Sequence, residues 1–296
     1  MKADILEKAS ERVLLLDSAM GTMLQRKGLK SGLDAGELWN IEEDKQNIVL
    51  EIHRANVDAG SEVIITNTFG ANRFKLGHYG AADRVREINS AGARLVNEAA
   101  GQERFVAGDI GPTGEILEQW GGERTTDEIR AAFEEQVAGL LDGGVDIFIL
   151  ETFMDVEELK LALESIRAAC DLRVIASMTF QSNAGQLATM WGLTPEQTAR
   201  ELATAGADII GANCGLGSRE MVEVVSRMAQ GSGLPICAQP NAGLPEVVDG
   251  ETVYHETAEQ MAERAVELVD AGARLIGGCC GSTPEFIAAA KQMLGL

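Results

Sequence analysis

Short runs of apolar residues recur along the whole chain, and each is followed by a polar or glycine-rich segment. Eight such runs are found, at residues 12–17, 62–67, 104–109, 146–151, 173–180, 207–213, 234–241 and 273–279. Within each run the apolar residues are nearly continuous and do not alternate with polar ones. This pattern is typical of parallel strands that are buried on both faces.

Amphipathic segments with helical periodicity separate these runs. They cover residues 46–59, 82–100, 126–142, 155–169, 195–205, 219–229 and 257–271. Four of them end in a glycine just before the next apolar run, namely Gly60, Gly144, Gly206 and Gly272. Glycine is the usual residue for closing a helix in the left-handed conformation, so these glycines mark the predicted helix ends.

The repeated order of strand and helix predicts the fold class. Eight such units in a chain of 296 residues indicate a (β/α)8 TIM barrel, which we expect to span residues 1–296 as one domain. A doubly wound open sheet is the alternative, but it would have fewer strands and a clear switch point. No linker, charge block or low-complexity segment divides the chain.

Composition narrows the classes of partner. The formal net charge is −21, and no cluster of Lys or Arg offsets it, which argues against binding to nucleic acid or to an anionic membrane surface. The N-terminus lacks a signal-peptide pattern, and no apolar run has the length of a transmembrane helix. With five cysteines, an odd number, we expect reduced thiols in a cytoplasmic protein.

In a TIM barrel the chemistry takes place at the carboxyl ends of the strands, so the residues there are candidates for the site. Polar and thiol side chains collect at these ends: Asp17, Glu151, Asn213, Cys214, Asn241, Cys279 and Cys280. Strands six and eight therefore bring three thiols to the same rim.

Three thiols on one open face are the ligand set of a catalytic zinc site, which keeps its fourth position for substrate. Consecutive strand residues point to opposite faces, so Cys279 and Cys280 can both bind one metal only if the backbone turns there. The glycines at 277, 278 and 281 allow this turn. The alternatives are cysteines that only fill the core, which we prefer for Cys170 and Cys237, and a structural zinc, which would need a fourth protein ligand.

The carboxylates of the rim indicate what occupies the fourth position. Asp17 and Glu151 can bind an amine, and the loop 18–22 offers backbone N–H groups to a carboxylate. A ligand that fills both sites carries an ammonium group and a carboxylate, as an amino acid does. A zinc ion with three thiolates favours a soft fourth ligand, so we expect an amino acid with a thiol. Each carboxylate could instead be a helix cap or an ion-pair partner.

Several motifs carry a resemblance to a known family. The segments DSAMGT, TNTFGAN, GDIGPTGE, ETF, GANCGLG, PNAGLP and GGCCGSTPE occur in this order. The chain resembles the homocysteine S-methyltransferase family, and within it the homocysteine-binding module of cobalamin-dependent methionine synthase, from about Val13 to Met293. The Asn-Cys motif and the Gly-Gly-Cys-Cys-Gly motif at this separation form the most specific part of the match.

The resemblance implies roles for individual residues. Cys214, Cys279 and Cys280 would bind zinc, Asp17 and Glu151 the amino group of homocysteine, and the turn at Gly21 and Thr22 its carboxylate. Ser18 and Asn213 belong to the same predicted substrate site. Two departures stand out: the family usually has glycine where this chain has Ser18, and the loop after strand five contains Met-Trp-Gly, which is closer to betaine-using relatives.

The implied reaction is the zinc-dependent transfer of a methyl group to homocysteine, which yields methionine. Zinc binding removes the thiol proton, so no general base is needed, in agreement with the absence of histidine from the rim motifs.

The resemblance favours methylcobalamin or another methyl-corrinoid as the methyl donor, because Thr152 follows Glu151 where betaine-using relatives favour tyrosine and because the chain contains TNTFGAN. The chain lacks the corrinoid-binding pattern Asp-x-His-x-x-Gly, so this donor would be free or on a partner protein or module. Trp39, Trp120, Trp191 and Asn241 are predicted to lie on the donor side. The alternatives are a stand-alone enzyme with a sulfonium or betaine donor and, from a different class, a phosphate-binding barrel lyase without zinc.

Overall fold

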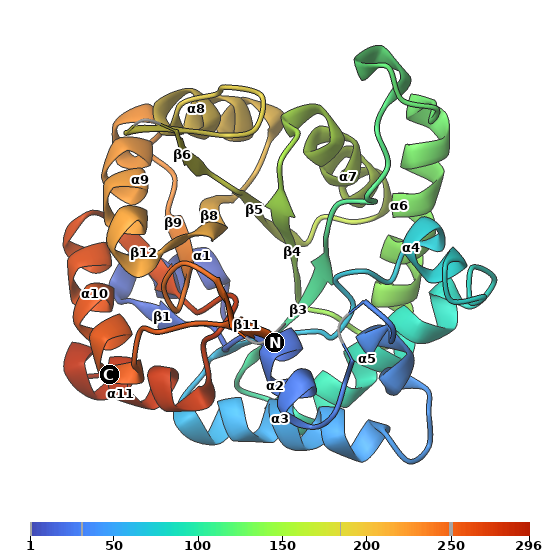
Figure 1. The fold of residues 1–296 in the computed structure, drawn as a ribbon, viewed down its shortest axis with the longest axis horizontal. Coiled ribbons are helices and arrows are strands. Elements are labelled where there is room, and N and C mark those ends of the chain that lie inside the picture. The colour runs from blue at the N-terminus through green and yellow to red at the C-terminus, as the bar shows by residue number, and fades with distance from the viewer. Residues whose placement is uncertain (1, 31, 184, 249–250) are drawn as a thin grey trace.

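Eight parallel strands surround the centre of the molecule (Figure 1). The computed structural model describes residues 2–30, 32–183, 185–248 and 251–296. The strands are β1 (Leu14–Leu15), β2 (Val63–Ile65), β3 (Phe105–Ile110), β4 (Ile147–Phe153), β5 (Arg173–Met178), β8 (Ile209–Gly217), β9 (Ile236–Asn241) and β12 (Ala273–Ile276). They pair in the order β1-β12-β9-β8-β5-β4-β3-β2, and a parallel bridge between Leu16 and Val63 connects the two ends of the sheet. The predicted (β/α)8 barrel is confirmed.

Helices cover the outside of the barrel. They are α3 (Gln46–Ala59), α5 (Val85–Ala100), α6 (Thr126–Gly143), α7 (Val156–Ala169), α8 (Pro195–Ala205), α9 (Ser218–Gly231), α10 (Ala258–Asp270) and α11 (Pro284–Leu294). The first seven match the predicted helical segments to within three residues at each end. The glycines at 60, 144, 206 and 272 all have positive φ, as expected for residues that close a helix. Among the described helices, none is long and apolar enough to cross a membrane.

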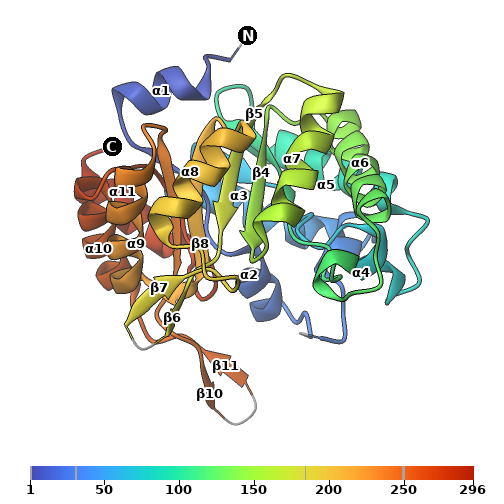
Figure 2. The same cartoon turned by 90° about the horizontal axis from the view of Figure 1, so that it is seen from above.

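Several short elements lie outside the repeating pattern. They are α1 (Ile5–Glu11), α2 (Met20–Arg26), η1 (Gly36–Asn40), α4 (Arg73–Gly77), η2 (Glu118–Trp120), and the hairpins β6 (Gln181–Asn183) with β7 (Gln186–Ala188) and β10 (Glu246–Val248) with β11 (Glu251–Val253). Figure 2 shows α1 at one end of the barrel and both hairpins at the opposite end. Ala184, in the loop after β5, lies outside the described residues.

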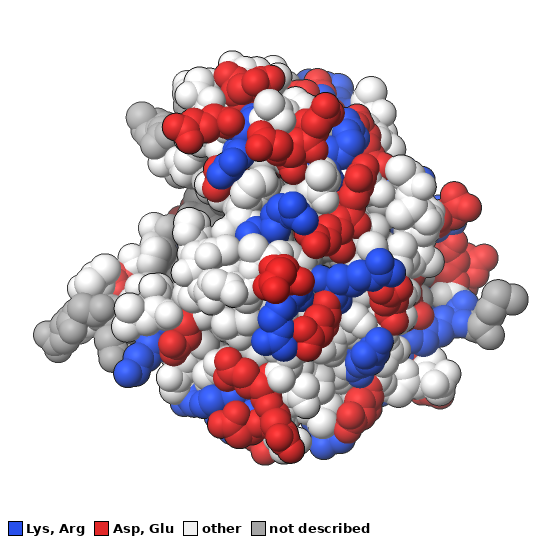
Figure 3. All heavy atoms as spheres, turned by 90° about the vertical axis from the view of Figure 1, so that its right-hand side faces the viewer, with Lys and Arg blue, Asp and Glu red and all other residues white. Residues whose placement is uncertain are grey.

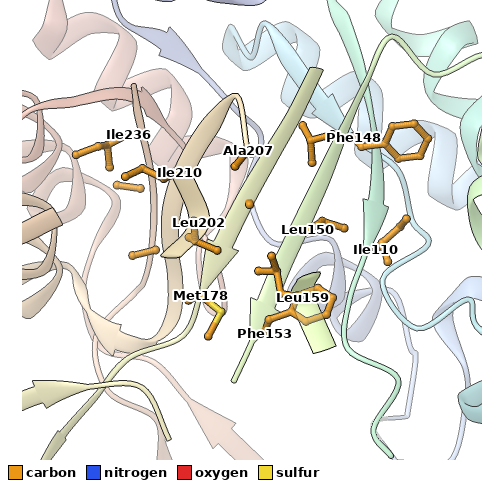
Figure 4. Close-up of a cluster of buried hydrophobic side chains, with 14 of the residues drawn as sticks. Ile110, Phe148, Leu150, Phe153, Leu159, Met178, Leu202, Ala207, Ile210 and Ile236 are labelled. Carbon is orange, nitrogen blue, oxygen red and sulfur yellow. The ribbon is translucent and has the colours of Figure 1, made fainter. Parts of the chain in front are cut away.

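The core has two layers because the side chains of each strand alternate between the barrel interior and the helices. One buried cluster fills the interior and includes Phe105, Ala107, Ile147 and Ile149. The intervening residues, such as Phe148, belong to a second cluster between strands and helices, part of which is drawn in Figure 4. The parity of a residue along its strand therefore tells whether its side chain points into the barrel.

The acidic surface contains many local ion pairs. Figure 3 shows acidic and basic side chains side by side over one face of the molecule. Arg86 of α5, for example, pairs with Asp142 of α6 at 2.5 Å, and Arg73 of α4 pairs with Glu135 of α6 at 2.8 Å. Such exposed pairs add little stability, and they leave the excess of acidic groups uncompensated.

Candidate metal centre and substrate site

Three cysteines meet at the carboxyl end of the barrel, although 65 residues or more separate Cys214 from the other two in the sequence. The Sγ atoms of Cys214 and Cys280 lie 3.9 Å apart, and those of Cys279 and Cys280 lie 4.0 Å apart. All three sulfurs lie within 4.8 Å of one another. The structure thus brings together the three thiols that the sequence proposed as metal ligands.

The backbone turns sharply at this cluster. Cys214 has φ 57°, a left-handed conformation that is uncommon for a residue other than glycine, and Gly215 follows with φ 69°. On the other side Gly281 has φ 83°, and its N–H donates to Thr22 Oγ1 at 2.9 Å. The first turn lies within β8, at the irregularity between Asn213 and Gly217, and the second follows β12; together they direct the three thiol side chains toward one point.

Asn213 connects the thiol cluster to two neighbouring strands. Its Oδ1 accepts hydrogen bonds from the N–H of Thr152 and from Ser177 Oγ, each at 2.8 Å. Its Nδ2 donates to Thr152 Oγ1 at 2.7 Å and lies 3.9 Å from Cys279 Sγ. The amide of Asn213 is fully buried and engaged within the protein, so its contribution is to hold the ends of β4, β5 and β8 in place.

Asp17 lies just beyond β1, with 3 % of its surface exposed. Its Oδ2 accepts a hydrogen bond from the N–H of Ile65 at 2.9 Å, and burial raises the pKa of Asp17 well above its ordinary value. The next residue, Ser18, donates from both its N–H and its hydroxyl to Asn56 Oδ1, at 2.9 and 2.8 Å. The hydroxyl that replaces the family glycine is therefore bound to helix α3.

Glu151 lies in β4, two residues after Ile149. Since strand side chains alternate and Ile147 and Ile149 point into the barrel interior, the side chain of Glu151 points into it as well. Its Oε2 accepts a hydrogen bond of 3.4 Å from Gln239 Nε2. Burial and the nearby Cys214 raise the pKa of Glu151 to about 7. Asp17 and Glu151 are thus two carboxyl groups in a poorly hydrated site, where a bound cation would favour their charged forms.

The remaining predicted residues divide between the rim and the core. Gly21 and Thr22 lie in the first turn of α2, whose N-cap has no side-chain hydrogen bond. Trp120 and Trp191 stack with ring centroids 4.8 Å apart and are 44 % and 49 % exposed. Trp39, by contrast, is 5 % exposed and lies in a hydrophobic cluster with Leu24, Val49 and Ile52.

Sequence reasoning did not identify three residues at the site. Asp109 lies near the end of β3 and Gln239 near the end of β9, and the GDIGPTGE motif gave the only signal for Asp109. Tyr254 follows the second hairpin, and its ring lies against Gly281. Hydrogen bonds from Cys214, Cys279 and Tyr254 lower the pKa of Cys280.

The chemistry and spacing of these donors fit a zinc ion. Two thiolates on a tetrahedral zinc lie about 3.8 Å apart, since each Zn–S bond is about 2.3 Å, and two of the observed separations are 3.9 and 4.0 Å. Asn241 Oδ1, at the end of β9, is buried without a hydrogen-bond partner among the described residues. The arrangement offers three soft ligands and leaves room for a fourth.

Comparison with known proteins gives matches over nearly the whole chain. A sequence model of the family described as Homocysteine S-methyltransferase matches residues 14–294. The methionine synthase of Mycobacterium tuberculosis (strain ATCC 25618 / H37Rv) is 32 % identical over 301 residues, which cover 96 % of this chain and 25 % of that protein. The chain thus spans about a quarter of the length of the curated relatives it matches.

Solved structures agree in fold. The homocysteine methyltransferase MmuM from Escherichia coli superimposes in its metallated form with a TM-score of 0.75 and 24 % identity, over 95 % of this chain and 96 % of that one. Its oxidized form gives a TM-score of 0.74 and 26 % identity, over 95 % of both chains. The comparisons confirm the family expected from the sequence.

Proposed function

The chain belongs to the homocysteine S-methyltransferase family, and from this premise we propose that it binds zinc through Cys214, Cys279 and Cys280 and transfers a methyl group to the sulfur of homocysteine, which yields methionine. The observation that carries the proposal is the convergence of the three sulfurs within 4.8 Å of one another. A phosphate-binding lyase has no comparable support, because the loops at 241–257 and 277–283 contain no Lys or Arg.

The chain's own residues bind and orient the substrate. Zinc, when bound, supplies Lewis acidity that lowers the pKa of a coordinated thiol. Asp17 and Glu151 hold the ammonium group of homocysteine from the barrel interior, and the turn at Gly21 and Thr22 receives its carboxylate. Asn213 keeps the strand ends in register through its bonds to Thr152 and Ser177, which fixes the direction in which the sulfur faces the donor.

For the donor, we infer a methyl-corrinoid carried by a partner protein or module. The relatives named methionine synthase are about four times as long as this chain, which leaves length for such a module. The tryptophan pair supports the same choice, because rings stacked 4.8 Å apart cover each other and leave no space for a small cation between them. The exposed stack suits a larger apolar surface, since aromatic side chains are enriched at interfaces.

The first experiment measures zinc content and homocysteine binding. We expect about one zinc per chain in the wild-type protein, and its loss in the Cys214→Ala, Cys279→Ala and Cys280→Ala variants by metal analysis. Titration with L-homocysteine should release a proton as the thiol ionises. Cys170→Ala is the matched control, because Cys170 lies at the end of α7 and should keep both zinc and binding. A folded wild-type protein that binds neither zinc nor homocysteine would contradict the proposal.

A further inference from the structure

A third carboxyl group, that of Asp109, points into the barrel beside the proposed ammonium site. Phe105 and Ala107 of β3 belong to the interior cluster, while Val106 and Ile110 belong to the layer that faces the helices. Asp109 continues the inward series, since strand side chains alternate. It is 3 % exposed and forms the layer directly above Ala107.

The strand registers place this carboxyl close to Asp17 and Glu151. Asp17 accepts its hydrogen bond from Ile65, and Ile65 pairs with Ala107, two residues before Asp109. On the other side Asp109 pairs with Ile149, two residues before Glu151. The carboxyl of Asp109 thus lies between the other two along the barrel wall. The charges of Glu151 and Asp17 add to burial in raising the pKa of Asp109.

Asp109 differs from these neighbours because one of its carboxyl oxygens has no hydrogen-bond partner among the described residues. Asp17 has the N–H of Ile65 and Glu151 has Gln239 as donors. Asp109 Oδ1 is buried without a hydrogen-bond partner among the residues that the structure describes. A buried polar atom in this state costs free energy unless a ligand supplies the missing partner.

The cation that acts on Asp109 from within the protein is Lys75. Its Nζ lies 4.5 Å from the centre of the Phe69 ring, and it also acts on Glu158. Within the described parts of the chain, Lys75 acts on Asp109 through its charge alone, without a hydrogen bond between the two side chains. Lys75 acts on Glu37 as well as on Glu158 and Asp109, and it is not among the charges that act on Asp17 or Glu151. Three neighbouring carboxyl groups with little access to water are unfavourable unless a bound ligand brings positive charge.

We propose that Asp109 is a third contact for the substrate ammonium group, beside Asp17 and Glu151, and that it makes the site select a thiol that carries an α-amino group. An ammonium group has three N–H donors, and this arrangement gives each of them one carboxyl acceptor. The inference rests on the proposed function, since it assumes an amino acid thiol whose sulfur lies at the cysteine cluster.

The test compares two ligands that differ only in the amine, L-homocysteine and 4-mercaptobutanoate, by calorimetric titration of the zinc-loaded protein. In the Asp109→Asn variant we expect the Kd for homocysteine to rise about tenfold to a hundredfold, because a charged hydrogen bond is lost. The Kd for 4-mercaptobutanoate should stay within about twofold of the wild-type value, since that ligand makes no such bond. Asp109→Ser should give the same pattern if the Asn variant folds poorly.

Lys75→Met is the control for a purely structural role. If Asp109 served only as the counter-ion of Lys75, this variant would weaken homocysteine binding as much as Asp109→Asn does, and the inference would be overturned. Equal losses for both ligands in Asp109→Asn, or no loss for either, would overturn it as well. A wild-type protein that does not bind homocysteine would instead refute the proposed function itself, so the two failures are distinguishable.

Discussion

At the scale of single residues, His53 is the clearest case of a polar side chain whose environment controls its ionisation. It lies in α3, is fully buried, and neither ring nitrogen has a hydrogen-bond partner among the described residues. Burial lowers the pKa of His53 to about 3. Its spacing from Val49 and Ile52, which are also buried, puts it on the inward face of the helix. It therefore acts as an uncharged core residue.

This burial predicts a pH-dependent stability. The folded protein keeps His53 neutral down to about pH 3, whereas the unfolded chain binds a proton near pH 6.5. At this residue the unfolded state thus binds more protons between these values, so the contribution of His53 to the free energy of unfolding falls as the pH decreases, by about 1.4 kcal/mol per unit below pH 6.5. The raised pKa of Glu151 contributes with the opposite sign, so the effect of His53 is read from the comparison with a variant. Urea denaturation of the metal-free protein at pH 7.5 and 5.5 measures this difference. His53→Leu should reduce it by about 1.4 kcal/mol, and an unchanged difference would refute the role of His53.

At the scale of elements, helix α1 closes the end of the barrel opposite the site (Figure 2). Ile5 and Ala9 belong to the interior cluster together with Leu14, Leu275 and other strand residues. Asp4 caps the helix by accepting from the N–H of Leu6, and it pairs with Arg173 at the start of β5 at 2.6 Å. The helix thus excludes water from this end of the barrel interior.

A substitution in α1 tests this role. Ile5→Ala removes a side chain that is 1 % exposed, and we expect the free energy of unfolding to fall by roughly 2–5 kcal/mol because a cavity replaces packed atoms. Glu7→Ala, on the exposed side of the same helix, should change it by about 0.5 kcal/mol or less. The Kd for homocysteine should remain unchanged in both variants. A higher Kd in Ile5→Ala would show that the two ends of the barrel are coupled.

The elements that the sequence predicted are those with a repeating pattern. The eight strands and seven of the helices follow from continuous apolar runs and from helical periodicity, and glycines mark the ends. The short helix α1 and the two hairpins carry no such pattern, since their conformation depends on the barrel against which they lie. The same holds within the site. The positions of Cys214, Cys279 and Cys280 follow from the expected strand ends, whereas the hydrogen bond of Asn213 with Thr152 depends on the tertiary packing of β8 and β4 on either side of β5.

At the scale of the whole molecule, the two ends of the barrel differ in their surface. The end that bears the site exposes Ile116, Trp120, Met154, Met190 and Trp191, which follow β3, β4 and β5 along the chain. The stacking of Trp120 on Trp191 joins the loop after β3 to the segment between β7 and α8. Aromatic and methionine side chains of this kind are enriched at protein interfaces, so this face suits a partner that brings the methyl group.

The exposed face of the molecule also leads to a prediction of the methyl donor. With homocysteine present, we expect methionine to form faster from methylcobalamin than from S-methylmethionine, S-adenosylmethionine or betaine, because the stacked rings cannot enclose a small cation.

Replacing both Trp120 and Trp191 by Ala should lower the methylcobalamin-dependent rate about tenfold, since exposed tryptophans contribute strongly to docking, while zinc content and the Kd for homocysteine stay the same. Methionine is measured by chromatography under saturating homocysteine. Faster turnover with a sulfonium or betaine donor would assign the chain to the stand-alone type of enzyme, whereas a loss confined to methylcobalamin in the double variant would place the contact surface of the corrinoid at this tryptophan pair.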